Sequence, residues 1–79
     1  MDEVVTRLEN CFRVVFPQLP AAEILAASQH SVAAWDSLAA ITLVSVIEEE
    51  FGIEMDLDAI AEFDSFPRIR NYVHGKMNA

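Results

Sequence analysis

Glycine, proline and cysteine are all scarce in this sequence. Its 79 residues include 2 glycines and 3 prolines, which disfavours a β-rich fold with many turns. The single cysteine, Cys11, has no partner for an internal disulfide, so we expect a reducing, cytoplasmic compartment. No apolar run is long enough to span a membrane, and the acidic N-terminus lacks the basic segment of a signal peptide.

Basic residues are scarce as well. Five Lys and Arg residues stand against 13 Asp and Glu residues, which gives a net charge of −8. This balance excludes the basic footprint of a nucleic-acid-binding protein, and an anionic membrane surface would repel the chain. We expect partner proteins with basic patches instead, because the acidic field would steer them into contact.

The length predicts one domain over residues 1–79 with one modest core. We expect this domain to be free-standing and monomeric. A chain of this size has little room for a deep substrate pocket beside its core, so we expect no enzyme activity. The apolar fraction of 53% excludes a disordered tail.

Apolar residues at helical spacing predict four helices. The first covers residues 2–16 and ends before Pro17. A long connection, residues 17–35, follows. It has a helical turn within Ala21–Ala27, and we expect four of its residues to fold back onto the core: Ile24, Leu25, Val32 and Trp35.

The second helix is predicted from Ser37 to Phe51, with Gly52 ending it. A short third helix is expected at Asp56–Glu62, with Asp56 as its N-cap and with Leu57 and Ile60 facing inward. The fourth runs from Phe66 to Lys76. The fold class is therefore all-α: a four-helix bundle of three longer helices and one short third helix, with a long loop between the first two. The second helix should bury Ala40, Leu43, Val44, Ile47 and Phe51.

The acids are concentrated in one part of the chain. Nine of them fall between Asp36 and Asp64, a stretch without Lys or Arg. Glu48–Glu50 lie at the C-terminal end of the second helix, where the helix dipole disfavours negative charge. This face is either a solvated surface or a docking surface for basic partners.

Side chains suited to catalysis or metal binding form no convincing cluster. Cys11 lies on the apolar face of the first helix, so we interpret it as a buried small side chain. His30 has no second ligand nearby and is expected to be solvated. The acids Glu54, Asp56 and Asp58 faintly suggest a calcium loop but lack its inner glycine and terminal acid. We therefore predict no catalytic residues and no metal site.

The segment Asp36-Ser37-Leu38, at the head of the second helix, carries the candidate site. Ser37 is either an ordinary N-cap or an attachment point for a phosphate-linked group. Asp36 places an acid beside that hydroxyl, and Leu38 can contact a partner. A capping box would need Glu or Gln three residues after Ser37, where Ala40 stands, so helix capping permits this serine without requiring it.

Most of the chain resembles an acyl carrier protein. The resemblance rests on the apolar first helix, the long loop, Asp36-Ser37-Leu38, the helix ending Ile47-Glu48-Glu49-Glu50-Phe51-Gly52, a short acidic third helix and the closing segment from Phe66 to Val73. It implies a carrier rather than a catalyst. A phosphopantetheinyl transferase (holo-ACP synthase) would attach 4′-phosphopantetheine from coenzyme A to Ser37, and partner enzymes would load and remove an acyl group held as a thioester.

The sequence departs from the fatty-acid-synthesis pattern of that family. Ala39 and Thr42 stand where those carriers commonly have acids, and Trp35 resembles carriers of specialised pathways, although it also suits simple packing under the loop. We therefore expect a dedicated lipid or polyketide-type pathway. The expected docking residues are Trp35, Leu38, Ile41, Thr42, Ser45, Glu48 and Glu49.

Two alternatives stay open. An aminoacyl or peptidyl carrier of a peptide-synthesis pathway would share these features. A non-covalent, acidic, helical adaptor would use Ser37 only as an N-cap, and would tolerate its loss.

Overall fold

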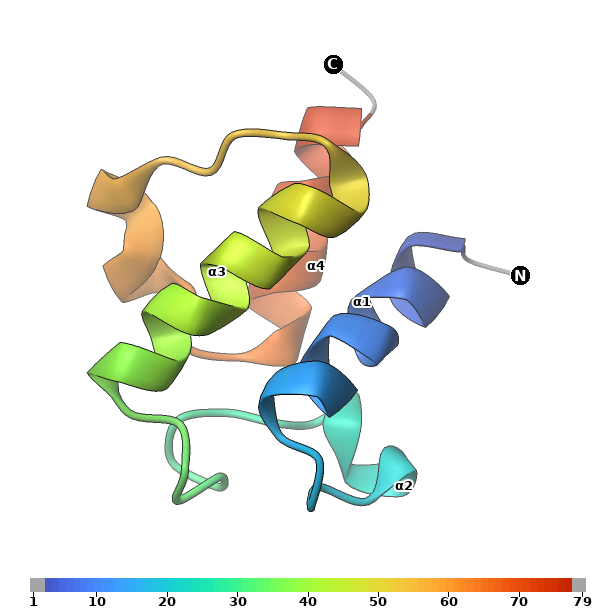
Figure 1. Ribbon diagram of the computed structural model, residues 1–79, viewed down its shortest axis with the longest axis vertical. Helices are drawn as coiled ribbons and strands as arrows, with labels where there is room; N and C mark the ends of the chain where they lie inside the picture. Colours follow the sequence, from blue (N-terminus) through green and yellow to red (C-terminus); the bar gives the residue numbers. More distant parts are fainter. Residues whose placement is uncertain (1–2, 78–79) are drawn as a thin grey trace.

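Three longer helices make up most of the fold (Figure 1). The computed structural model describes residues 3–77, apart from the side chains of Leu57 and Ala59. The helices are α1 (Glu3–Val15), α3 (Ser37–Phe51) and α4 (Phe66–Met77), joined through a short helix α2 (Ala21–Ile24) and a 3₁₀ helix η1 (Leu57–Glu62). Within the described residues there is no strand, which confirms the all-α prediction. Asp2, predicted to open the first helix, lies outside that range.

The core lies where α1 packs against α3 and α4. The helical period places every predicted inward residue of α3 in the core, because residues three and four apart share one face. The buried residues of α3 are Ala40, Leu43, Val44, Ile47 and Phe51. They meet Leu8, Cys11 and Phe12 of α1 and Phe66, Ile69 and Val73 of α4.

The loop between α1 and α3 is fixed to the bundle by side chains and by backbone hydrogen bonds. Ile24, Val32 and Trp35 are buried as predicted. Leu25 is 50% exposed, so its predicted core position is wrong. The four-residue α2 turns Ile24 inward, and the next residue along a helix points to a different side. The backbone N–H of Phe66 donates to the carbonyl of Ala27 at 2.9 Å, which joins this loop to the start of α4.

The connection from α3 to α4 follows the predicted capping pattern. Gly52 ends α3 in the left-handed conformation, with φ of +64°. Asp56 caps η1, since its side chain accepts a hydrogen bond from the N–H of Asp58 at 2.9 Å. Ile60 is partly buried against the core, while the predicted inward side chain of Leu57 lies outside the described part of the chain.

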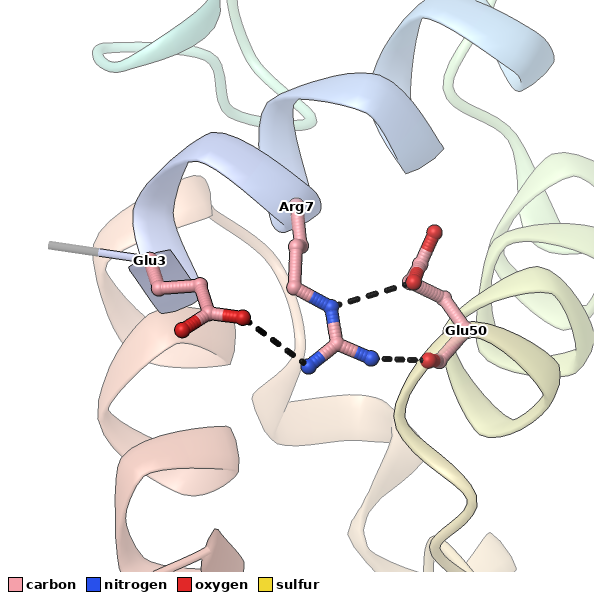
Figure 2. A network of polar contacts seen from close by, with 3 residues as sticks. All are labelled: Glu3, Arg7 and Glu50. Carbon is pink, nitrogen blue, oxygen red and sulfur yellow. Dashed lines mark hydrogen bonds and ion pairs between the residues drawn. The ribbon is translucent and has the colours of Figure 1, made fainter.

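Arg7 links α1 to the last turn of α3 (Figure 2). Its Nε lies 3.0 Å from Oε2 of Glu50, and its Nη2 donates to the backbone carbonyl of the same residue. The guanidinium also lies 4.5 Å from the ring centroid of Phe51. Its Nη1 lies 4.0 Å from Oε1 of Glu3. Arg7 thus satisfies both an acid and a terminal carbonyl at the negative end of the α3 dipole.

None of the helices within residues 3–77 combines the length and the apolar character needed to cross a membrane.

Candidate functional site

Asp36, and not Ser37, caps α3. Asp36 has extended backbone angles, and its Oδ1 accepts a hydrogen bond from the N–H of Ala39 at 2.8 Å. Ser37 is the first helical residue. The interpretation of Ser37 as an N-cap is therefore wrong, because the carboxylate one residue earlier already satisfies the free N–H group that a cap serves.

The hydroxyl of Ser37 is consequently left free of a structural role. The side chain is exposed, and among the described residues it makes no hydrogen bond. It lies at the positive end of the dipole of a 15-residue helix. A phosphodiester on this oxygen would be favoured electrostatically and would meet no steric obstacle from burial.

An exposed strip of α3 leads away from Ser37. Leu38 is 73% exposed and Ile41 51% exposed, and helical spacing puts the exposed residues Thr42, Ser45 and Glu49 on the same face. The hydroxyl of Thr42 donates to the carbonyl of Leu38 at 3.0 Å, which uses that donor within the helix. We call this strip the α3 surface: Leu38, Ile41, Thr42, Ser45 and Glu49, all exposed.

Trp35 is not part of the α3 surface, although it was expected among the docking residues. It is only 4% exposed. Its ring lies 5.4 Å from that of Phe12 and 5.6 Å from that of Phe16, measured between centroids. Burying a ring of this size against two others favours the core over solvent, so packing explains this tryptophan.

The three acids at the end of α3 have different surroundings. Oε2 of Glu48 accepts a hydrogen bond from the N–H of Met55 at 2.8 Å, and the residue is half-buried. Glu50 pairs with Arg7. Glu49 is exposed and is the acid of the three that points its charge to solvent. The expected destabilisation by charge at this helix end is thus offset at two of the three positions.

A hollow beside Ser37 includes a residue that the sequence did not single out. Val14 of α1 is 68% exposed and lines this hollow together with Asp36 and Leu38. Val14 falls outside the apolar stripe of its helix, and an apolar residue off such a stripe is the signal that could have identified it.

Groups that would support catalysis are not assembled around Ser37. Within the described residues no cluster of three or more His, Cys, Asp or Glu side chains could hold a metal ion. Burial raises the pKa of the Cys11 thiol to about 11, and the nearby Glu50 charge adds to that rise. A buried, protonated thiol is a poor nucleophile. His30 is exposed.

Comparison with known proteins agrees with this arrangement. Residues 19–73 match the model of the phosphopantetheine attachment site family, which covers more than half of the chain. No curated protein matches the chain at a significant level. The match confirms the resemblance to carrier proteins and favours a carrier over the non-covalent adaptor, because domains of this family bear covalent 4′-phosphopantetheine and are carriers without catalytic activity of their own. The exposed hydroxyl at the head of α3, the cap that leaves it free and the family match agree: the chain belongs to the phosphopantetheine attachment site family of carrier domains.

Proposed function

We propose that Ser37 bears the 4′-phosphopantetheine group, and that the protein carries an acyl group on it for delivery to partner enzymes. The observation that carries the assignment is the division of roles at the head of α3. Asp36 supplies the cap, so the hydroxyl of Ser37 is exposed and unbonded. When bound, the group supplies a terminal thiol that holds the acyl group as a thioester.

Three features of the chain itself favour this attachment. The helix dipole stabilises the negative phosphodiester at Ser37. The cap at Asp36 fixes the first turn of α3 and hence the direction in which the hydroxyl points. The ring of Trp35, two residues before Ser37, anchors the loop in the core. The attachment point is therefore held on a rigid element rather than on a free loop.

Partner enzymes would bind the α3 surface. A carrier domain must contact a phosphopantetheinyl transferase and the enzymes that load and remove its cargo. The α3 surface begins one residue after Ser37 and places two exposed apolar side chains, Leu38 and Ile41, before the exposed acid Glu49. Apolar contact with a charged rim suits a transient protein partner with a basic patch.

The same proposal includes the class of pathway. Ala39 and Thr42 leave the first turns of α3 without the acids that are common in fatty-acid carriers, and charge removal can change partner choice as effectively as charge addition. We assign the protein to a dedicated lipid or polyketide-type pathway, as a single-domain monomer in a reducing, cytoplasmic setting.

Intact-mass measurement tests the attachment site. The apo protein is incubated with coenzyme A and a broad-specificity phosphopantetheinyl transferase. We expect one arm on the wild-type protein and none on Ser37→Ala. Ser31→Ala is the matched control, because Ser31 is also an exposed serine but lies outside the α3 surface, and this variant should accept the arm normally. An arm on Ser37→Ala, or an unmodified wild-type protein with several transferases, would contradict the proposal.

A further inference from the structure

A hollow of about 350 Å³ lies where the end of α1 meets the start of α3 (Figure 1). Leu38 and Val14, which line it, are the two most exposed large apolar side chains among the described residues, at 73% and 68%. A single exposed apolar residue is ordinary on a protein surface, but two that line one hollow are typical of an interaction site. We call this feature the α1–α3 hollow.

The α1–α3 hollow offers few free hydrogen-bonding groups. Besides Leu38 and Val14, its lining residues are Val15, Ala34, Asp36, Ala39 and Thr42. Oδ1 of Asp36 accepts a hydrogen bond from the N–H of Ala39, and the hydroxyl of Thr42 donates to the carbonyl of Leu38. None of the described lining residues is a lysine or an arginine. An apolar group therefore suits the hollow, because it covers apolar surface and displaces water without leaving polar atoms unpaired.

The position of the hollow indicates which protein supplies that group. Asp36 and Leu38 are the two neighbours of Ser37 in the chain, and both line the hollow. The enzyme that attaches the arm must bring its reacting phosphate to the hydroxyl of Ser37, so it must also cover these neighbours. Enzymes that act on the cargo meet it at the far end of the arm and are not bound by this requirement.

The hollow shares two residues, Leu38 and Thr42, with the α3 surface. A transferase on the α3 surface therefore extends over the edge of the hollow. Asp36 lines the hollow and Glu49 lies at the far end of the α3 surface, so acids at both ends complement a basic rim on the enzyme. Large apolar side chains that fill a pocket inside such a rim supply much of the binding energy of protein interfaces.

We infer that the α1–α3 hollow receives a large apolar side chain of the phosphopantetheinyl transferase. Val14 of α1 is then a docking residue, and the enzyme recognises two helices rather than α3 alone. The inference rests on the proposed function, because it needs an enzyme that modifies Ser37.

Transfer kinetics test the role of Val14. The rate of arm transfer from coenzyme A is measured by intact mass over a range of apo-protein concentrations. Val14→Ala should raise the KM for the protein by about 3- to 10-fold, because the contact of two methyl groups is lost, and should leave kcat nearly unchanged.

Leu25→Ala is the matched control for these kinetics. Leu25 is 50% exposed and lies outside both the hollow and the α3 surface, so its truncation should leave KM and kcat unchanged. A wild-type KM in Val14→Ala, or the same rise in Leu25→Ala, would overturn the inference.

Two added acids distinguish an apolar occupant from a basic one. Thr42→Glu places a carboxylate in the wall of the hollow, and Ser45→Glu places the same charge on the α3 surface outside the hollow. Thr42→Glu should raise the KM, since an apolar side chain would have to desolvate the new charge. Ser45→Glu should lower the KM or leave it unchanged, because the rim of the enzyme is basic. A lower KM in both variants would show that the hollow receives a basic side chain, and would overturn the inference.

Methyl NMR locates the contact directly. Ser37→Ala is mixed with the transferase and coenzyme A, so that it binds without accepting an arm. We expect shifts at Val14 and Leu38 and none at Leu25. Wild-type protein that accepts no arm would overturn the proposed function and this inference with it, whereas an arm on Ser37 together with unshifted Val14 methyl groups would overturn the inference alone.

Discussion

Oδ1 of Asp36 accepts a hydrogen bond from the N–H of Ala39 at 2.8 Å. The helix cap and the exposed hydroxyl of Ser37 therefore belong to two different residues. One residue fixes the first turn of α3, and the next presents its hydroxyl to solvent. The two roles can therefore be removed one at a time.

The cap variants should differ in stability. Asp36→Ala should lose about 1 kcal/mol of unfolding free energy, because an N-cap bond is removed. Ser37→Ala should change it by less than about 0.5 kcal/mol, since this exposed residue makes no bond that holds the helix. Urea unfolding measures both, with Glu49→Ala as an exposed control on the same helix. A loss in Ser37→Ala as large as that in Asp36→Ala would contradict the assigned cap.

Trp35 should behave as a core residue. Trp35→Ala removes a ring packed on Phe12 and Phe16 and should cost about 3–5 kcal/mol. Trp35→Phe should cost less, because it keeps aromatic packing and removes a buried Nε1–H that has no hydrogen-bond partner among the described residues. Thermal and urea unfolding measure these losses. Unchanged stability in Trp35→Ala together with weaker partner binding would restore the docking interpretation.

Arg7 should contribute more than an ordinary surface ion pair. Arg7→Ala loses the bonds to Glu50 and the contact with the Phe51 ring, for an expected cost of about 1–2 kcal/mol. Arg13→Ala is the control, since Arg13 makes one loose pair with Glu9 at 3.9 Å, and should cost about 0–0.5 kcal/mol. Equal losses in urea unfolding would show that the link between α1 and α3 adds no stability.

We expect the folded protein to lose stability in alkaline solution because of the buried Cys11 thiol. Desolvation by burial raises its pKa from 9.0 to about 11 in the folded protein. Between these values the unfolded chain releases the thiol proton while the folded protein keeps it. The protonated thiol therefore leaves the free energy of unfolding unchanged below pH 9, and this free energy decreases as the pH rises towards 11.

Comparison with Cys11→Ala isolates this effect. The variant should be less stable below pH 9, because a buried side chain is shortened, and the gap to the wild-type protein should narrow between pH 9 and pH 11. Urea unfolding across this interval measures the gap. Parallel curves for the two proteins would show that the thiol does not titrate differently on unfolding.

Glu49 is the acid best suited to test docking by the α3 surface. Glu49→Lys should weaken binding to a phosphopantetheinyl transferase several-fold and should reduce the dependence of that binding on salt. Glu48→Lys is less informative, because it also breaks the bond to the N–H of Met55. Glu54→Lys changes the net charge equally from an exposed site outside the α3 surface. If Glu49→Lys and Glu54→Lys weaken binding equally, Glu49 acts only through the overall electrostatic field of the protein.

Much of the helical framework was predictable because its signals are local. The helical period of α3 predicted its five buried residues. Pro17, Gly52 and Asp56 indicated helix ends, because their effect on the backbone depends on near neighbours in the chain. Leu25 shows where this reasoning fails. Its apolar character suggested burial. In the structure the buried side chain of the four-residue α2 is that of Ile24, and the next residue, Leu25, points away from the core.

The sequence by itself determined the helical class, the inward face of α3 and the acidic charge, because each depends on composition or on spacing along one helix. Its resemblance to a carrier family pointed to the segment that contains the proposed attachment residue. Only the tertiary structure decided that Trp35 packs against Phe12 and Phe16, that Glu50 pairs with Arg7, and that Val14 and Ala34 line a hollow beside Ser37. These relationships join residues far apart in the chain. They depend on how the helices pack, and no local pattern encodes that packing.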